Sequence, residues 1–278
     1  MQNFEIKNNY LFNENKNQIK KMWLENFLDD TENIVDDFLE NVFKNEKGVG
    51  AFFNNELIAM ILFLNSKIIF KNKKINSVYY YCVCTNEKYR NKGIMKGLFE
   101  YAKSISKEHG YEISFLVPAN EELFSMYEKL SFSRAIGYEE KTFFKEDFDD
   151  KNTLIETTDF CYNDYKKLKV EVSRVSPVVL WDEYEFNFIF NKNRKDVSFL
   201  FSKSGYAIYE KQNDGISVLE ACGDENGIAA SIFNKEKNCK SIKMRLPGKS
   251  GCIDFGMTLN LTETTSEVNA IYFGMPYG

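Results

Sequence analysis

The decisive stretch of the chain reads Arg90-Asn91-Lys92-Gly93-Ile94-Met95-Lys96-Gly97. It follows a strand-like run that ends Val83-Cys84-Thr85, and it opens a predicted helix over residues 91–108. The first backbone N–H groups of a helix have no partner inside the helix, so together they can bind an anion. Gly93 permits close approach of the backbone, and positive charge comes from Arg90, Lys92 and Lys96. The stretch therefore predicts a pyrophosphate site, although its spacing alone fits a purely structural helix start as well.

Periodic hydrophobic residues predict the elements around this stretch. Helices are expected at residues 16–28, 31–44, 91–108 and 121–130, and strands at 48–53, 56–64, 74–85, 112–117 and 132–144. Hairpins combined with a strand–helix–strand connection are typical of an α+β fold, that is, an α/β arrangement with a mixed sheet.

An acidic run from Glu146 to Asp150 marks the expected boundary between two domains, 1–148 and 149–278. In the second, smaller domain, helices are expected at 162–172, 179–191 and 225–234, and strands at 197–201, 206–211, 215–222, 240–246 and 267–273. Because this order partly repeats that of the first domain, we interpret the chain as a diverged internal duplication.

The composition narrows the classes of partner and compartment. The chain has 278 residues with 36 basic and 41 acidic side chains, a net charge of −5, so no basic nucleic-acid-binding face is expected. The longest apolar run, residues 57–64, is far shorter than the roughly 20 residues that span a bilayer. The first residues carry no signal-peptide pattern. We expect a soluble cytoplasmic protein without nucleic-acid or membrane partners.

The six cysteines and the single histidine form no metal-binding pattern, because no CxxC pair or ligand spacing is present. Cys82 and Cys84 share a face of one predicted strand and are interpreted as reduced packing residues. His109 precedes Gly110 at a helix end and is interpreted as a capping or surface residue. We expect no metal site.

Three motifs follow one another in the first domain. They are Arg90-x-x-Gly93 after Val83-Cys84-Thr85, then Pro118-Ala119-Asn120, and then Tyr127-Glu128-Lys129-Leu130-Ser131-Phe132. This order resembles the GNAT superfamily of acyl-CoA-dependent N-acyltransferases over about residues 1–145. Two positions depart from the family pattern: Met95 stands in place of a small residue, and Ser131 in place of a glycine.

The resemblance implies direct transfer of the acetyl group of acetyl-CoA, the co-substrate, to a primary amine in a ternary complex. The acceptor would be a small-molecule or peptide amine. The resemblance also implies that the backbone of residues 83–85 binds the pantetheine arm, that the amides of residues 91–96 hold the pyrophosphate, and that Tyr127 protonates the departing thiolate. The implied cofactor-binding residues are Val83, Cys84, Thr85, Arg90, Asn91, Lys92, Gly93, Ile94, Met95, Lys96 and Asn120.

The sequence leaves alternatives open for the residue that acts as general acid and for the one that acts as general base. Because Leu123, Tyr127 and Leu130 share helical spacing, the Tyr127 phenol could instead pack in a core. The strand at 74–85 holds no glutamate that could act as base. In multidomain acetyltransferases of this superfamily, the C-terminal carboxylate serves as base. The resemblance therefore implies that the Gly278 carboxylate lies beside Tyr127. The alternative is a C-terminal tail that only closes the second domain. Carboxylates of the opening helices either steer a cationic acceptor or form a solvated face: Asp29, Asp30, Glu32, Asp36, Asp37 and Glu40.

The second domain lacks the basic loop. Its corresponding run, residues 218–227, carries Asp224-Glu225, which would repel a pyrophosphate. It resembles the degenerate second GNAT-like domain of the multidomain acetyltransferases named for enhanced intracellular survival. Two other classes of function stay open, namely a non-catalytic acyl-CoA-binding regulator and an interaction protein that binds through Tyr79-Tyr80-Tyr81.

Overall fold

The computed structural model describes residues 7–148, 153–190, 197–213, 215–248, 252–262 and 270–273. Its helices are α1 (Lys16–Asn26), α2 (Glu32–Asn41), α3 (Ile94–Glu108), α4 (Glu121–Glu128), α5 (Tyr162–Val172), α6 (Glu183–Ile189) and α7 (Glu225–Lys235). Its strands are β1 (Lys7–Tyr10), β2 (Gly48–Phe53), β3 (Glu56–Phe70), β4 (Lys73–Thr85), β5 (Ile113–Leu116), β6 (Ser133–Phe144), β7 (Val178–Trp181), β8 (Ser198–Ser202), β9 (Gly205–Gln212), β10 (Gly215–Gly223), β11 (Ser241–Leu246) and β12 (Ile253–Asn260).

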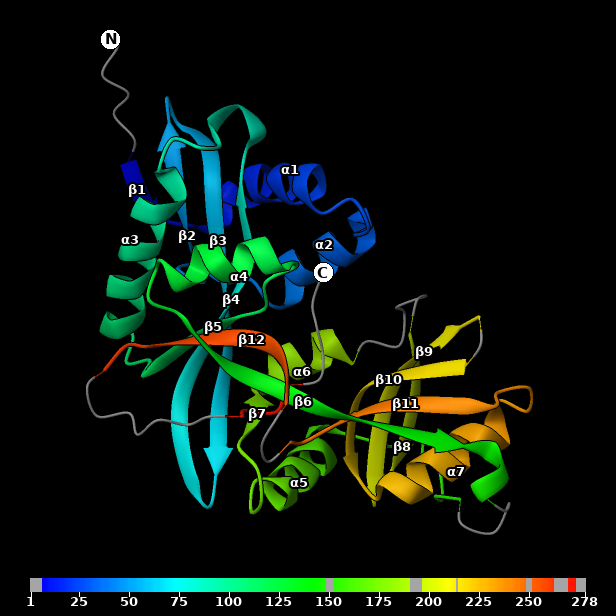
Figure 1. Ribbon diagram of the computed structural model, residues 1–278. Helices are drawn as coiled ribbons and strands as arrows, with labels where there is room; N and C mark the ends of the chain where they lie inside the picture. Colours follow the sequence, from blue (N-terminus) through cyan, green and yellow to red (C-terminus); the bar gives the residue numbers. More distant parts are fainter. Residues whose placement is uncertain are drawn as a thin grey trace.

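The first half of the chain is an antiparallel meander followed by a parallel crossover (Figure 1). Strands β1 to β4 pair antiparallel in chain order, and α3 then returns the chain so that β5 pairs parallel with β4. The α3 helix forms because its apolar residues fall on one face, where Ile94, Leu98, Ala102 and Ile105 are all buried. The α+β fold with a mixed sheet, predicted from the sequence, is confirmed.

The consecutive tyrosines of β4 show which helices cover which face of the sheet. The rings of Tyr80 and Phe99 of α3 lie 5.9 Å apart, whereas Tyr81 packs 5.1 Å from Trp23 of α1. Because successive side chains of a strand point to opposite faces, α3 and α1 cover opposite faces. Helix α4 lies on the α3 face, where the ring of Tyr127 is 5.6 Å from that of Phe99.

The second half repeats the order of elements in the first. Strands β8, β9 and β10 form an antiparallel meander, α7 crosses over, and β11 pairs parallel with β10. A register shift interrupts the last strand of each meander, opposite Met60 and Leu62 for β4 and between Val218 and Glu220 in β10. The duplication expected from the sequence therefore has a counterpart in the topology.

Strands cross between the two halves. Strand β12 lies between β5 and β6, and β7 pairs with β3, although both follow residue 148 in the chain. In return, β6 leaves the first part of the sheet and pairs along residues 139–144 with β11, as Figure 1 shows. If the chain is divided at residue 148, as we propose, the two domains exchange strands and neither sheet is complete without the other.

Two stretches of the second half differ from the sequence-based expectation. The first part of the helix predicted at 179–191 is wrong, because its β-branched and aromatic residues form β7 and pair with β3; α6 begins only at Glu183. Strand β12 was not predicted, although Pro247-Gly248 precedes it and its apolar residues alternate with polar residues or glycine from Ile253 to Asn260. Of the strand predicted at 267–273, the described residues hold two isolated bridges, from Ile271 to β6 and from Tyr272 to β7.

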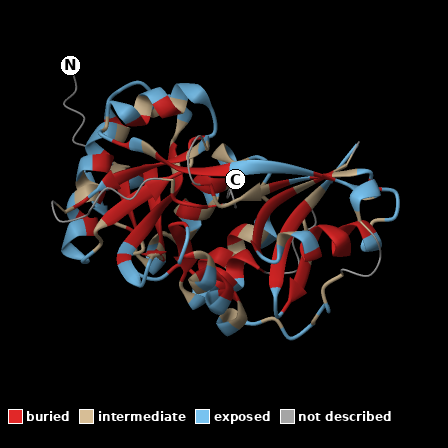
Figure 2. Cartoon of the chain, turned by 60° about the horizontal axis from the view of Figure 1, so that its bottom comes forward, coloured by how far each residue is buried: buried red, intermediate tan, exposed pale blue. Residues whose placement is uncertain are grey.

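A buried ion pair joins α5 to β10. The Lys169 Nζ atom lies 2.7 Å from Glu220 Oε1, and the two side chains are 1% and 2% exposed. The Tyr206 hydroxyl donates a hydrogen bond to the same carboxylate, and the Tyr272 hydroxyl accepts one from the backbone of Ala221 at 3.0 Å. Figure 2 shows buried residues along the strands of both halves, and one hydrophobic core continues from one half into the other.

Candidate active site

Strands β4 and β5 separate immediately after the last residue pair that they share, and we call the opening between them the wedge. The two strands pair at Ser77 with Ile113, Val78 with Ser114, and Tyr79 with Phe115. Beyond this pair β4 continues to Thr85, while β5 ends at Leu116, which pairs with Met257 of β12 on the other edge. The backbone of residues 80–85 therefore has no strand partner on the β5 side among the described residues, which leaves a free sheet edge inside the fold.

A bulge in β4 shapes this edge. Cys82 and Val83 stand opposite the single residue Ile61 of β3, and Cys82 has φ +48°. The bulge changes which side of β4 the following side chains face: Cys84 pairs with Met60 and so shares the face of Tyr81, on the α1 side of the sheet, where it lines the edge of a cavity. Burial raises the pKa of both thiols well above the ordinary value. Both cysteines are therefore protonated at neutral pH and are poor nucleophiles.

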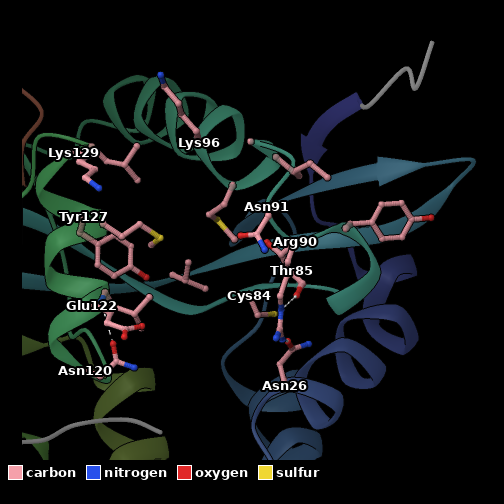
Figure 3. Close-up of a pocket in the computed structure, with 18 of the residues that line it drawn as sticks. Asn26, Cys84, Thr85, Arg90, Asn91, Lys96, Asn120, Glu122, Tyr127 and Lys129 are labelled. Atoms are coloured by element: carbon pink, nitrogen blue, oxygen red, sulfur yellow. Dashed lines mark hydrogen bonds between the residues drawn. The ribbon is translucent and has the colours of Figure 1, made fainter. Parts of the chain in front are cut away.

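A cavity of about 940 Å³ occupies the wedge between β4, α3 and α4 (Figure 3). It collects all the predicted site residues of the described part of the chain except Lys92. The predicted residues that line it are Val83, Cys84, Thr85, Arg90, Asn91, Gly93, Ile94, Met95, Lys96, Asn120 and Tyr127.

The start of α3 presents free amides to this cavity. Asn91 (φ +61°) and Gly93 (φ +75°) adopt left-handed backbone conformations, so the chain turns sharply before the helix begins at Ile94. No described residue accepts a hydrogen bond from the N–H groups of residues 91–96. A Cβ added at Gly93 would meet no atom within 4 Å. These amides and the open space before them form an anion-binding helix start.

The basic side chains divide between two tasks. Arg90 donates to the Thr85 carbonyl at 3.1 Å and to Asn26 Oδ1 at 2.9 Å, so it ties the loop to β4 and α1 (Figure 3). Lys92 donates to the Lys88 carbonyl at 2.9 Å and does not line the cavity. Positive charge at the cavity wall comes in addition from Lys96 and Lys129.

Helix α4 forms the opposite wall. Its cap, Asn120, accepts a hydrogen bond from the Leu123 amide at 3.0 Å, which fixes the start of the helix. Two turns later the Tyr127 ring packs edge-on against Phe99, and it also contacts Phe132 at 5.8 Å. In Figure 3 the Tyr127 hydroxyl points into the cavity, and no described residue hydrogen-bonds it. The ring of Tyr127 is therefore packed in the core, while its hydroxyl faces the cavity; its role as proton donor stays a prediction.

Burial also sets the protonation of this phenol. Tyr127 is 5% exposed, and desolvation, followed by the electrostatic effect of Cys84, raises its pKa above the ordinary value. A raised pKa keeps the hydroxyl protonated across the neutral range. The group can donate a proton or a hydrogen bond into the cavity but cannot act as a resting base.

Several lining residues were not predicted from the sequence. Leu123 and Met126 share the α4 face of Tyr127, so helical spacing from Tyr127 could have identified them. Asn26 and Phe27 come from the end of α1, far away in the chain, and no local pattern marks them. Glu122 also lines the cavity and gives its α4 wall a negative charge.

The acidic residues of the opening helices are mostly bound within their own region. Lys20 Nζ lies 3.1 Å from Glu32 and 2.8 Å from Asp36, and Asp30 accepts the indole N–H of Trp23 at 2.8 Å. These contacts match the interpretation of the cluster as a solvated helix face. Gly278, the expected base, lies outside the described residues.

The described residues contain neither a metal-binding cluster nor a membrane-spanning helix. No group of three or more His, Cys, Asp or Glu side chains there is arranged to hold a metal ion. His109 stacks on Tyr10 with ring centroids 5.9 Å apart, which accounts for it as a surface residue. None of the described helices is both long and apolar enough to cross a bilayer.

The second half has a cavity in the corresponding place, with different chemistry. About 530 Å³ open beside the ends of β10 and β11, lined by Cys222, Gly223 and Glu225 among others. The Asp224 carboxylate caps α7 by accepting the Gly227 amide at 3.1 Å, and Glu225 pairs with Lys141 at 3.1 Å. The start of α7 is thus closed by its own carboxylate, as the sequence of this run suggests.

Comparison with known proteins places the fold. Residues 10–135 match the family model described as acetyltransferase (GNAT) domain. None of the curated proteins compared with the chain matches it. A GCN5-related N-acetyltransferase from Kribbella flavida superposes with TM-score 0.71 at 14% identity, over 92% of this chain and 71% of that one. A probable N-acyltransferase from Enterococcus faecalis V583 gives TM-score 0.72 at 12% identity, over 92% and 72%.

A tandem GNAT protein from the clavulanic acid biosynthesis pathway is also similar in fold. It superposes with TM-score 0.51 at 8% identity, over 94% of this chain and 100% of that one. The match over both halves agrees with the repeated order of strands. At these identities the solved structures show a shared fold, while the family model identifies the first half by sequence. The chain therefore contains, in residues 10–135, an acetyltransferase domain of the GNAT family.

Proposed function

We propose that the chain is an N-acetyltransferase that transfers the acetyl group of acetyl-CoA to a primary amine by direct attack in a ternary complex. One observation carries the proposal: the free amides of residues 91–96 and the Tyr127 hydroxyl face the same cavity, at the place where β4 and β5 part. The first group suits a pyrophosphate, and the second suits a leaving group that needs a proton.

The residues present fit the parts of acetyl-CoA. The amides of residues 91–96, with Lys96 and Lys129 beside them, would hold the pyrophosphate. The free edge of β4 at residues 83–85 would hydrogen-bond the amide groups of the pantetheine arm as an added strand does. The Asn120 amide group, whose oxygen already caps α4, would offer its N–H to the same arm. Bound in this way, acetyl-CoA would supply a thioester carbonyl beside the bulge.

The chemistry asks little of the protein besides position and one proton. The amine nitrogen forms a bond to the thioester carbon while the carbon–sulfur bond breaks, and the nitrogen gives up one proton to a base, for which the Gly278 carboxylate is proposed below. Tyr127 donates a proton to the departing sulfur and recovers one from solvent afterwards. The raised pKa values of Cys82 and Cys84 argue against an acylated cysteine, and this favours direct transfer.

A short acyl group is favoured by what closes the end of the wedge. At the last β4–β5 pair the rings of Tyr79 and Phe115 stack 5.0 Å apart, and the two residues are 2% and 0% exposed. We expect these buried rings to block a long acyl tail. Acetyl-CoA is therefore the proposed donor. The six free cysteines agree with a reducing cytoplasm, where we expect this donor to be met.

Gly278 remains the proposed base on the resemblance to multidomain acetyltransferases. A terminal carboxylate with a pKa near 3.5 is a weak base for an ammonium group, so it would act through desolvation or a water relay. Two residues appended after Gly278 would move the carboxylate and leave the fold unchanged. Lost turnover with intact acetyl-CoA binding is expected; full turnover would remove Gly278 from the mechanism.

The test of the whole proposal is thiol release from acetyl-CoA with a panel of amines: spermidine, an aminoglycoside, tyramine and a lysine-containing peptide. We expect release that depends on one class of amine and on enzyme concentration. Acetyl-CoA binding in calorimetry without release for any amine would instead support the non-catalytic regulator. Absence of binding would overturn the assignment of the cavity.

A further inference from the structure

Tyr79 carries, at the end of a buried ring, a hydroxyl that the proposed reaction has not yet used. The residue is 2% exposed, and no described residue hydrogen-bonds its hydroxyl. Its neighbour Tyr80 is equally buried, but the Tyr80 hydroxyl lies 2.9 Å from Ser106 Oγ. The Tyr79 oxygen is not among the fully buried unpaired atoms of the described residues, so it keeps some accessible surface at the end of a buried ring. A hydroxyl that is accessible and has no protein partner can hydrogen-bond a ligand.

The position of Tyr79 says where that ligand would lie. Tyr79 belongs to the last β4–β5 pair, so its side chain stands at the apex of the wedge. Because Tyr80 packs on α3, Tyr79 points to the other face of the sheet, away from the cavity that we assign to acetyl-CoA. On that face its ring contacts Trp181 at 5.9 Å and Phe273 at 5.7 Å. The phenylalanine rings at this place, Phe115 included, have no hydrogen-bonding atoms.

Electrostatics connect Tyr79 with the reacting groups. Burial, and after it the electrostatic effects of Cys82 and Tyr127, raise the pKa of Tyr79. The hydroxyl therefore stays protonated and neutral across the neutral range. Tyr127 approaches the opening from the α4 side and Tyr79 from the opposite side. A thioester held between them would be reached by an amine arriving on the Tyr79 side.

We propose that the Tyr79 hydroxyl binds the attacking nitrogen of the acceptor amine by accepting a hydrogen bond from one of its N–H groups. The inference rests on the proposed acetyl transfer and adds the contact on the acceptor side. One lone pair of the phenol oxygen fixes one N–H bond, so the nitrogen lone pair is turned toward the carbonyl carbon. Orientation of this kind lowers the barrier without any change in the bonds that form and break.

Two consecutive tyrosines provide the test. Tyr79→Phe removes an unpaired hydroxyl, so we expect an unchanged or slightly higher melting temperature and an unchanged KM for acetyl-CoA. We expect kcat/KM for the best amine of the panel to fall about 3- to 10-fold, as for the loss of one neutral hydrogen bond. The matched control, Tyr80→Phe, removes the hydrogen-bond partner of the Ser106 hydroxyl. Its melting temperature should be roughly 2–4 °C lower, and its kcat/KM should stay within twofold of the wild type.

The outcomes separate this inference from the function on which it rests. If the wild-type chain releases thiol with no amine, the acetyl transfer itself fails, and the acceptor contact fails with it. If the wild-type chain is active and Tyr79→Phe matches it within twofold, only the role of Tyr79 is overturned. An equal loss of kcat/KM in Tyr79→Phe and Tyr80→Phe would also overturn it, because the effect would then come from packing.

Discussion

The phenol of Tyr127 joins a packed ring to a hydroxyl that faces the cavity, so a single atom can be removed without disturbing the core. Tyr127→Phe should lower kcat by roughly 10²- to 10⁴-fold, because the departing sulfur loses its proton donor. The KM for acetyl-CoA and the melting temperature should stay unchanged, since no described residue hydrogen-bonds this hydroxyl. Steady-state kinetics with thermal unfolding checks both; an active but less stable variant would make Tyr127 a packing residue.

The raised pKa of Tyr127 has a direct consequence for the pH profile. A free tyrosine loses its proton near pH 10. Burial keeps the protonated form of Tyr127 to higher pH, and that is the form that donates. Measured at saturating acetyl-CoA and amine, kcat should therefore show no decline between about pH 8 and pH 10. A decline with a midpoint below 10 that disappears in Tyr127→Phe would contradict the burial argument.

Gly93 and Gly110 form a natural pair for testing the phosphate site. Both have a left-handed backbone, φ +75° and +78°, and neither has an atom within 4 Å of an added Cβ. Gly93→Glu and Gly110→Glu should therefore lose a similar roughly 1–2 kcal/mol of folding stability. Only Gly93→Glu puts a negative charge before the α3 amides, so only this variant should lose acetyl-CoA binding in calorimetry. Equal affinity in the two variants would reject the loop assignment.

At the scale of elements, the buried pair between Lys169 and Glu220 fastens α5 to β10. Lys169→Met leaves a buried carboxylate whose remaining partner among the described residues is the Tyr206 hydroxyl, and it should cost about 3–5 kcal/mol. Adding Glu220→Gln removes the orphaned charge and keeps an acceptor for Tyr206, so the double variant should recover most of the loss. Urea unfolding of the three proteins tests this. A double variant as unstable as the single one would mean that packing, not charge, decides.

The elements also show how far sequence reasoning reaches. The loop at Gly93 and the α4 face of Tyr127 could be predicted because their signals are local: glycine at a turn, helical spacing, a capping asparagine. The contact of Arg90 with Asn26 could not, since 64 positions separate them and neither has a pattern that names the other. Tyr79 was visible only as part of a tyrosine run. Whether the Tyr79 hydroxyl has a hydrogen-bond partner depends on packing from α1, α3 and β7.

At the scale of the whole molecule, the first half cannot close its sheet alone. Residues 1–148 lack β7 and β12, so β5 and β6 would expose unpaired edges and Tyr79 would lose Trp181 and Phe273. This fragment should be insoluble or unfolded and should not bind acetyl-CoA, in contrast to the full chain. Circular dichroism and calorimetry decide. A folded fragment with full affinity would make the exchanged strands dispensable.

The place of β12 between β5 and β6 also matters while the protein is being made. Residue Leu116 of β5 must wait for Met257 of β12 before its outer edge is paired. At about 5–20 residues per second, the ribosome leaves that edge open for roughly 10–30 s. During this interval the nascent chain offers an unpaired strand to chaperones and to its neighbours. A message broken before β12 would therefore yield no partly active product.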